Sequence, residues 1–195
     1  MFTFREIDPQ DADMILRWRM THRVAKFMNS DVSYDLGAQT KWISSCYSNE
    51  RYYHWIISNN NVPVGLINLA DYSSTDKTTS YGFYIGAEGL DACGAFIPPY
   101  FYNFLFNTLA VSRINVEVFY NNVNVIGLHL LHGYRFIPAN DRVIIRNGKD
   151  VLLVAMALEK NNWNFNRYGK CFASFPVSKW ISKPKFLGSS AFPVS

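Results

Sequence analysis

One stretch, from Ile114 to Tyr134, constrains the fold of this chain more than any other. Apolar residues alternate with polar ones from Ile114 to Tyr120, which is the two-residue period of a strand with one buried face. The polar pair Asn121-Asn122 then favours a helix cap. Apolar residues recur at helical spacing until Gly133, the residue type that ends helices in the left-handed conformation. The stretch therefore predicts a strand, a cap, a short helix and a glycine stop in immediate succession.

The composition bounds the class of protein. At 195 residues, 49% of them apolar, the chain is expected to form one domain with a single core. No run approaches the roughly 18 apolar residues of a membrane span, and the start of the sequence lacks the pattern of a secretion signal. Cys46, Cys93 and Cys171 are odd in number and far apart, which favours free thiols over disulfides or a zinc site. We therefore expect a cytoplasmic protein with no membrane span and no metal.

The net charge of +4 is unevenly distributed. Residues 160–195 contain 6 basic and no acidic residues, so the first 159 contain 19 − 6 = 13 basic and 15 acidic residues. A nucleic-acid-binding domain carries its basic residues on the folded face, so this pattern does not favour a nucleic acid as partner. Residues 160–195 lack a sustained hydrophobic period. We expect them to form a basic, aromatic-containing, partly ordered tail behind a folded domain of residues 1–159.

Periodicity also places the other elements. Strands are expected near residues 2–7, 52–58, 62–69, 79–86, 134–145 and 150–158, and helices near 11–20, 38–47 and 98–109. Asn147-Gly148 predicts a two-residue turn between the last two strands. The full order is β, α, α, β, β, β, α, β, α, β, β. This order predicts an α/β fold with a mixed central sheet of about seven strands and four helices.

A family resemblance rests on the segment from Asn122 to Tyr134. It resembles the Asn-x-x-Ala-x-x-Leu-Tyr-x-x-x-Gly-Phe signature of the GNAT acetyltransferases, which use acetyl-CoA. Val125 stands at the position of the small residue, and His129 stands where the family usually has a tyrosine near the CoA sulfur. The expected order of elements is also that of the GNAT fold. The resemblance implies a GNAT domain with acetyl-CoA as cosubstrate.

Binding of acetyl-CoA requires hydrogen-bond donors for its pyrophosphate, and the free backbone N–H groups at a helix start can supply them. The candidate residues lie between a predicted strand and a predicted helix: Asp91, Ala92, Cys93, Gly94 and Ala95. The family has an Arg/Gln-x-x-Gly-x-Gly/Ala loop here, in which Asp91 would take the basic or amide position. An ordinary strand-to-helix connection is the alternative.

The same resemblance implies where the pantetheine arm of CoA binds. Backbone groups of the strand that contains Phe83, Tyr84 and Ile85 would face the arm, and Asn122 and Val125 would contact it from the end of the next strand. For Asn122 the alternative is a helix cap alone.

Two side chains are candidates for proton transfer. Glu117 lies mid-strand, where it would either face the cleft with a raised pKa and remove the proton of the amine, or be solvated or paired at the sheet surface. His129 fills the family's general-acid position. With an ordinary pKa near 6.5 it would protonate the leaving thiolate or accept the proton of the amine. The sequence places no histidine partner beside Cys93, so we do not expect a covalent intermediate.

Within the superfamily, the chain is most similar to the nucleotide-sugar N-acetyltransferases of pseudaminic acid biosynthesis, which acetylate a UDP-linked 4-amino-4,6-dideoxysugar. The similarity rests on short motifs in matching order, among them Leu16-Arg17-Trp18-Arg19, Tyr81-Gly82-Phe83-Tyr84 and Val116-Glu117-Val118. It implies that the acceptor pocket is lined by Arg19, Phe27, Met28, Trp42 and Tyr84. For Trp42 an ordinary core aromatic is the alternative.

Two other functions stay open from the sequence. A ribosomal-protein type of N-terminal acetyltransferase shares the fold but needs an acidic acceptor groove, and few acids surround the expected pocket. The second open function is that of a non-catalytic GNAT scaffold that binds CoA or a partner protein. The sequence fixes neither the acceptor amine nor the oligomeric state, and it leaves a homodimer open.

Overall fold

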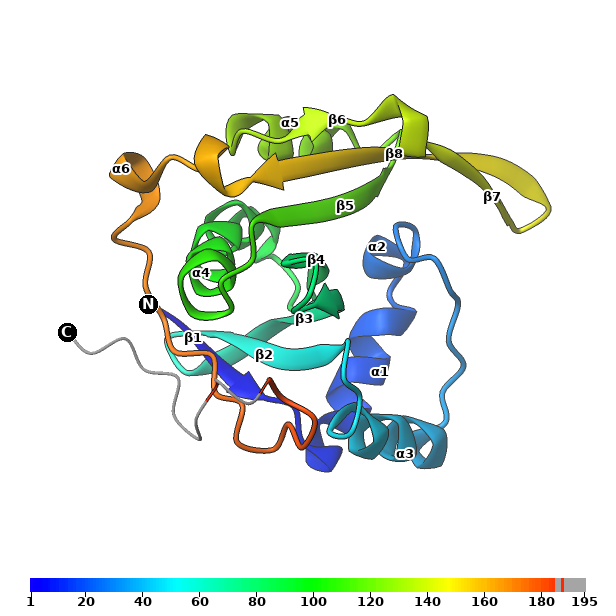
Figure 1. Cartoon of the computed structure of the whole chain (residues 1–195). Helices are drawn as coiled ribbons and strands as arrows, with labels where there is room; N and C mark the ends of the chain where they lie inside the picture. Colours follow the sequence, from blue (N-terminus) through cyan, green and yellow to red (C-terminus); the bar gives the residue numbers. More distant parts are fainter. Residues whose placement is uncertain (185–186, 188–195) are drawn as a thin grey trace.

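The computed structural model describes residues 1–184 and residue 187. Within them, 8 strands form one mixed sheet in the order β1-β2-β3-β4-β5-β8-β6, with β7 paired to β8 (Figure 1). The strands are β1 (Phe2–Glu6), β2 (Tyr53–Asn59), β3 (Val62–Ser73), β4 (Thr78–Ile85), β5 (Arg113–Phe119), β6 (Arg135–Phe136), β7 (Arg142–Arg146) and β8 (Lys149–Glu159). The α/β architecture and the order of its elements are those that the sequence predicts.

The described part contains six α-helices where four were expected. They are α1 (Ala12–Met20), α2 (His22–Ala25), α3 (Leu36–Cys46), α4 (Pro98–Asn103), α5 (Val123–Leu131) and α6 (Phe165–Tyr168). The two additional helices, α2 and α6, have four residues each and lie outside the helices that periodicity predicts. None of the helices in the described residues is long and apolar enough to cross a bilayer.

Two predicted elements are interrupted. The helix expected over 98–109 changes winding after Asn103, where α4 gives way to a wider π-helical turn, Phe104–Thr108. The strand expected over 134–145 breaks between β6 and β7 at a 3-10 turn, Pro138–Asn140. A proline has no N–H group to donate to a neighbouring strand, which is why the strand ends there.

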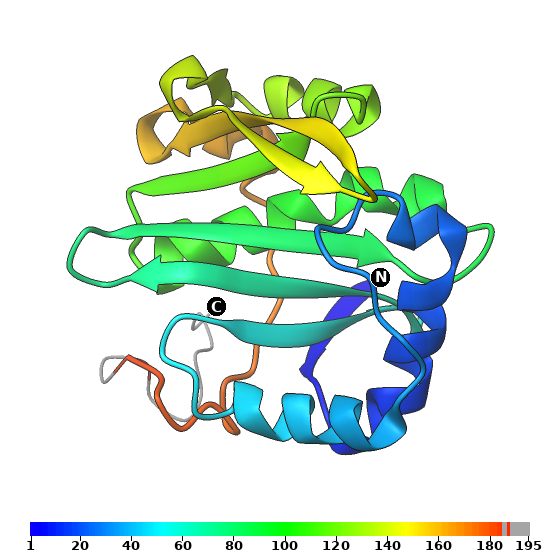
Figure 2. The same ribbon diagram turned by 90° about the vertical axis from the view of Figure 1, so that its right-hand side faces the viewer.

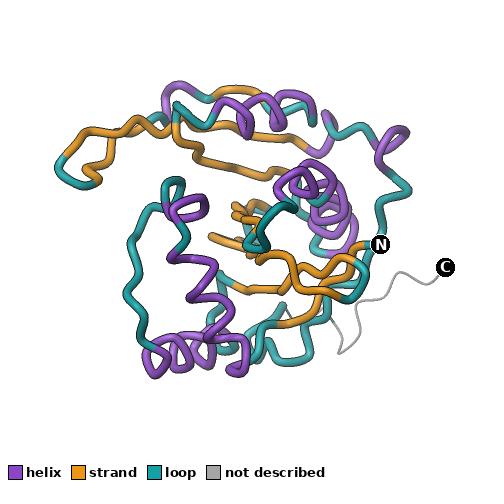
Figure 3. The backbone as a smooth tube through the Cα atoms, turned by 180° about the vertical axis from the view of Figure 1, so that it is seen from behind, coloured by secondary structure: helices purple, strands orange, loops and turns teal. Residues whose placement is uncertain are grey.

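The sheet separates two apolar cores. On one face α1 and α3 cover the sheet through Ile15 and Ile43, which pack against Ile56 of β2. On the other face Trp55, the neighbour of Ile56, packs against Phe101 of α4 within the larger core. Figure 3 shows these helices on opposite sides of the strands. Because successive side chains of a strand point to opposite faces, β2 is buried on both.

The chain after β8 packs into the larger core as far as it is described. Trp163, Phe175 and Trp180 are 4%, 0% and 0% exposed. In Figure 1 this orange and red segment runs from the β8 side of the sheet to β1 and β2. The boundary between a domain of residues 1–159 and a tail of residues 160–195 stays a prediction, and residues 185–186 and 188–195 of that tail lie outside the described residues.

The feature that positions the site is the separation of β4 from β5. These strands are parallel neighbours, but their ladder has only the pairs Thr78↔Arg113, Thr79↔Ile114 and Ser80↔Asn115. Beyond Ser80, β4 stays paired with β3, whereas β5 stays paired with β8. The two strands therefore part from Tyr81 onward.

A hairpin crosses towards α2 beyond that separation. The turn between β7 and β8 is formed by Asn147 and Gly148, whose φ angles of 50° and 71° fit the primed turn that the sequence predicts. Beside the turn, Arg146 donates hydrogen bonds to the carbonyl oxygens of Ala25 and Lys26, at 2.5 Å and 2.6 Å. Figure 2 shows the yellow hairpin beside the blue helix. The hairpin thus joins the two sides of the gap.

Candidate active site

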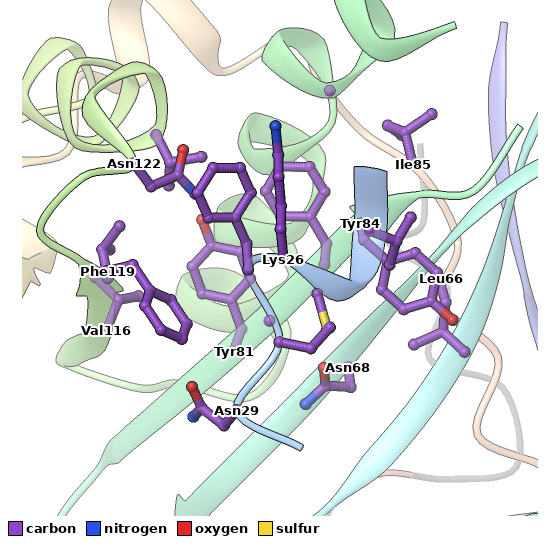
Figure 4. A pocket seen from close by; sticks show the side chains of 18 of the residues that line it. Lys26, Asn29, Leu66, Asn68, Tyr81, Tyr84, Ile85, Val116, Phe119 and Asn122 are labelled. Atoms are coloured by element: carbon purple, nitrogen blue, oxygen red, sulfur yellow. The ribbon is translucent and has the colours of Figure 1, made fainter. Parts of the chain in front are cut away.

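A cleft of about 1240 Å³ opens where β4 and β5 part. Figure 4 shows Tyr81 between Val116 and Phe119 of β5 on one side and Leu66 and Tyr84 on the other. The residues of the predicted site that line this cleft are Arg19, Phe27, Met28, Trp42, Phe83, Tyr84, Ile85, Asp91, Ala92, Gly94, Ala95, Glu117, Asn122, Val125 and His129. Cys93 does not line it.

The edge of β4 that faces the gap provides backbone hydrogen-bonding groups. From Tyr81 to Ile85 this edge has no strand partner on the β5 side. Unpaired N–H and C=O groups of a strand edge bind extended chains that carry amide groups of their own. The edge therefore offers a surface for a chain such as pantetheine.

Asn122 lies at the opposite wall of the cleft, directly before α5. It occupies the cap position, but its side chain accepts no hydrogen bond from the helix. The alternative of a helix cap alone therefore does not account for the side chain, which lines the cleft instead.

The loop at the open end of β4 contains the 3-10 turn η2 (Asp91–Phe96), which precedes α4. Asp91 forms an ion pair with Arg23 of α2. The same guanidinium group donates to the carbonyl oxygens of Ile85 and Gly86, at 2.9 Å and 2.8 Å. Sequence reasoning missed Arg23. The available signal was the acid at position 91, where the family has a basic or amide side chain, because a phosphate site with an acid needs a cation from elsewhere.

The His129 side chain is only 3% exposed, although it lines the inner part of the cleft. Its Nδ1 atom lies 3.5 Å from the hydroxyl oxygen of Tyr102. Burial, with a smaller contribution from His132, lowers the pKa of His129 to about 3. The expectation of an ordinary pKa near 6.5 is therefore wrong, because it ignored the loss of solvation. At neutral pH the imidazole is neutral and carries no extra proton.

Glu117 is paired rather than free. Arg142 of β7 donates from Nε to one carboxylate oxygen at 2.7 Å and from Nη2 to the other at 2.6 Å. The Glu117 side chain is 39% exposed. This geometry matches the interpretation of Glu117 as a paired residue at the sheet surface. For Glu117 to act as a free base in the cleft, its ion pair with Arg142 would have to open.

The side of the cleft formed by α1, α3, β2 and β4 contains four buried polar atoms that have no hydrogen-bond partner among the described residues. They are Arg19 Nε, Gln39 Nε2, His54 Nδ1 and Tyr84 Oη, and all four residues line the cleft. A buried polar atom without a partner costs about 1–3 kcal/mol. All four atoms are buried within the wall of the cleft, so a ligand in the cleft would reach them only after this wall rearranges.

His54 and Trp42 lie together on this side of the cleft. The Trp42 ring packs edge-on against the His54 ring, with centroids 4.9 Å apart, and Trp42 is 39% exposed while its neighbour Ile43 is fully buried. Trp42 is thus a cleft residue, not a core aromatic. Burial lowers the pKa of His54 to about 4, so this imidazole is neutral. Sequence reasoning missed Gln39 and His54, because no local pattern marks them.

The charges of the cleft are unequal. Its basic lining residues are Arg19, Arg23 and Lys26, and its acidic ones are Asp91 and Glu117. Both acids are in ion pairs, whereas within residues 1–184 no carboxylate lies within ion-pair distance of Arg19 or Lys26. Arg19 instead donates to the carbonyl oxygen of Ser30 at 3.0 Å. The cleft therefore favours an anionic or oxygen-rich ligand.

The sequence profile described as an acetyltransferase (GNAT) domain matches residues 2–135. The chain belongs to the GNAT acetyltransferase family. It is an acetyl-CoA-dependent acyltransferase, and the resemblance seen in the Asn122 to Tyr134 segment is confirmed at the level of the superfamily.

Solved structures agree with this fold. A spermidine N-acetyltransferase from Vibrio cholerae, in complex with CoA and spermine, superposes with a TM-score of 0.74 at 12% identity, covering 83% of this GNAT chain and 96% of that chain. A probable acetyltransferase gives a TM-score of 0.73 at 16% identity, covering 83% and 94%. At these identities the likeness shows the fold alone. A comparison with curated proteins gave no significant match.

Proposed function

We propose that this GNAT enzyme transfers the acetyl group of acetyl-CoA directly to a primary amine of a small molecule, the 4-amino group of a UDP-linked amino-deoxysugar. The observation that carries the proposal lies on the side of the cleft formed by α1, α3, β2 and β4, which we call the acceptor side. Arg19 on that side has no carboxylate partner among the described residues, whereas Asp91 and Glu117, the acids of the cleft, are both paired. A phosphate of the acceptor would supply the anion that Arg19 lacks.

The cofactor fits the other side of the cleft. The pyrophosphate would bind the loop of Asp91, Ala92, Cys93, Gly94 and Ala95, next to Arg23. The pantetheine arm would follow the free edge of β4. Asn122 and Val125 face that path from α5.

The acceptor side matches the two parts of a nucleotide-linked deoxysugar. Arg19 lines the cleft and, as far as the chain is described, has no carboxylate partner, so its guanidinium group is able to donate charge-assisted hydrogen bonds to a phosphate. Phe27, Met28, Trp42 and Tyr84 provide apolar surface for the methyl-bearing sugar ring.

A polyamine fits less well. The similar Vibrio cholerae structure holds spermine, but a polyamine carries several positive charges and needs carboxylates to bind them. Asp91 and Glu117, the acids of this cleft, are already paired with arginines. The same argument disfavours an N-terminal acetyltransferase with an acidic acceptor groove.

The catalytic roles of His129 and Glu117 remain predictions. His129 is a neutral imidazole at neutral pH, so it would have to accept a proton before it could donate one. Glu117 would act as a base only after its ion pair with Arg142 opens. Turnover by His129→Ala and Glu117→Gln tests them. Loss of turnover with intact CoA binding would support these catalytic roles, and turnover at the wild-type rate would contradict them.

The experiment is an assay of free CoA release against amino-sugar nucleotides, polyamines and N-terminal peptides. We expect turnover with a UDP-linked amino sugar. Arg19→Met should raise the KM for that acceptor about 10- to 100-fold through the lost charge-assisted bonds. Arg17→Met is the matched control, because Arg17 pairs with Asp13 on the outer surface of the same helix.

Preference for a polyamine, or an equal KM for the Arg19 and Arg17 variants, would contradict the proposed acceptor. Binding of acetyl-CoA without turnover of any amine would favour the non-catalytic scaffold instead.

A further inference from the structure

Tyr81 lies at the point where β4 and β5 part. It is the first residue of β4 after the last pair with β5, Ser80↔Asn115. It lines the main cleft and also a second, smaller cavity of about 500 Å³, and Val116 and Glu117 of β5 do the same. The Tyr81 ring is therefore at the closed end of the gap. Figure 4 shows it between the β5 side chains and those of the acceptor side.

The closed end of the gap is where the sulfur of a bound cofactor would lie. The predicted pyrophosphate loop, residues 91–95, returns to the open end of β4, where Arg23 contacts both Asp91 and the carbonyl oxygen of Ile85. Four residues back along β4 lead to Tyr81, a distance of about 13 Å at about 3.3 Å per residue. An extended pantetheine arm has a similar length. A cofactor held at its pyrophosphate by the loop would thus carry its thioester to Tyr81.

The Tyr81 hydroxyl group belongs to a chain of polar atoms. Its oxygen lies 2.6 Å from that of Tyr102, a fully buried residue of α4, and the Tyr102 oxygen lies 3.5 Å from Nδ1 of His129. Tyr102 does not line the cleft, whereas Tyr81 does. Burial raises the pKa of Tyr81, so the hydroxyl group keeps its proton at neutral pH.

We propose that the Tyr81 hydroxyl group is the proton donor to the CoA thiolate, and that Tyr102 and His129 are positioning residues behind it. This inference rests on the proposed direct transfer in this cleft. The neutral amine attacks the thioester carbon and forms the C–N bond, and the electron pair of the breaking C–S bond leaves on sulfur. Tyr81 gives its proton to that sulfur. The proton lost by the amine nitrogen returns to the Tyr81 oxygen, which the Tyr102 hydroxyl group stabilises meanwhile.

This assignment accounts for the histidine at position 129. A buried neutral imidazole is a poor substitute for the tyrosine that the family usually has there. In the proposed arrangement, the tyrosine hydroxyl group that donates to the sulfur comes from β4 instead.

A binding experiment tests the contact without relying on turnover. Wild type should bind CoA about 2- to 10-fold more tightly than desulfo-CoA, because a hydrogen bond to the sulfur contributes about 0.5–1.5 kcal/mol. Tyr81→Phe should abolish that ratio and leave the affinity for desulfo-CoA unchanged. The matched control is Tyr72→Phe, which removes a buried hydroxyl group that has no partner in the described part of the chain and lies in the core outside the cleft. An equal ratio in wild type and Tyr81→Phe would overturn the proposal.

A kinetic experiment tests the proton transfer with any amine that wild type acetylates. Tyr81→Phe should lower kcat about 10²- to 10⁴-fold. Tyr102→Phe should lower it less, and the double variant should match Tyr81→Phe alone, because Tyr102 acts through Tyr81. The solvent isotope effect on kcat should fall in Tyr81→Phe. Full activity of Tyr81→Phe would overturn the proposal, whereas absence of turnover by wild type would contradict the proposed function and leave the binding test decisive.

Discussion

Three histidines in or beside the cleft are held in their neutral form. Burial lowers the pKa of His129 to about 3 and that of His54 and His132 to about 4. An unfolded histidine has a pKa near 6.5. The unfolded chain therefore binds more protons than the folded one between these values, and acid favours unfolding.

We predict that the free energy of unfolding is constant above about pH 6.5 and falls as the pH is lowered towards 4. The loss should be on the order of a few kcal/mol, since each unit of pKa difference corresponds to about 1.4 kcal/mol. Urea unfolding at pH 7.5 and at pH 5 measures it. His132→Gln should reduce the loss, whereas His22→Gln, which removes an exposed histidine, should not. Equal stability at the two pH values would contradict the prediction.

At the scale of single elements, β3 and β4 approach closely because of a glycine. A Cβ atom added to Gly65 would lie 2.2 Å from the carbonyl oxygen of Tyr84, which no real contact allows. Gly65 pairs with Ile85 at the open end of β4, beside the predicted pyrophosphate loop. The position of this end of the cleft therefore depends on the absence of a side chain in the neighbouring strand.

We predict that Gly65→Ala destabilises the protein by about 1–3 kcal/mol and weakens acetyl-CoA binding, because β4 must shift outward. Thermal unfolding and titration calorimetry measure the two effects. Gly127→Ala is the control for stability. Gly127 lies within α5 and its added Cβ would meet nothing within 4 Å, so alanine should be neutral or slightly stabilising there. A Gly65 variant that binds as wild type does would show that β4 is not displaced.

The sequence predicts elements well where the signal is local. The alternation of β5, the position of Asn122 and the left-handed Gly133, with φ 94°, all lie within one continuous segment. The same holds for the turn at Asn147-Gly148. Each pattern is complete within a few residues, so no distant contact is needed to read it.

The site was only partly predictable because its remaining features join distant segments. Arg23 meets Asp91, and Arg142 meets Glu117, across separations of 68 and 25 residues. The pKa of His129 depends on burial by a helix that its own segment does not reveal. Such pairings follow from the path of the sheet, which hydrophobic periods do not specify.

At the scale of the whole molecule, the chain after β8 holds the sheet together. It leaves the β8 side, contributes Trp163 beside α4, and continues to β2, where Nε1 of Trp55 donates to the carbonyl oxygen of Pro176 at 2.7 Å. β4 and β5 share only three ladder pairs. This C-terminal segment is thus a second connection between the two parts of the sheet.

We predict that a chain ending at residue 162 does not fold. It would lack Trp163, Phe175 and Trp180, and truncation of one buried aromatic costs about 3–5 kcal/mol, against about 5–15 kcal/mol for the stability of a whole domain. Circular dichroism during thermal unfolding measures this. As a milder pair, Phe175→Ala should lower stability by about 3–5 kcal/mol, whereas Phe172→Ala, at a position 56% exposed, should not. A cooperative transition in the shortened chain would contradict the prediction.

The buried carboxylate of Glu6 bears on the order in which the fold is completed during synthesis. It accepts hydrogen bonds from the hydroxyl groups of Tyr53 and Ser178 and, at 2.7 Å, from the backbone N–H of Lys179. Two of these donors lie 172 and 173 residues further along the chain. While the ribosome is still making the middle of the protein, these two donors do not yet exist, so the Glu6 carboxylate has to be satisfied by water. The interactions of β1, the first strand to be made, are therefore completed only after residues 178 and 179 have been added.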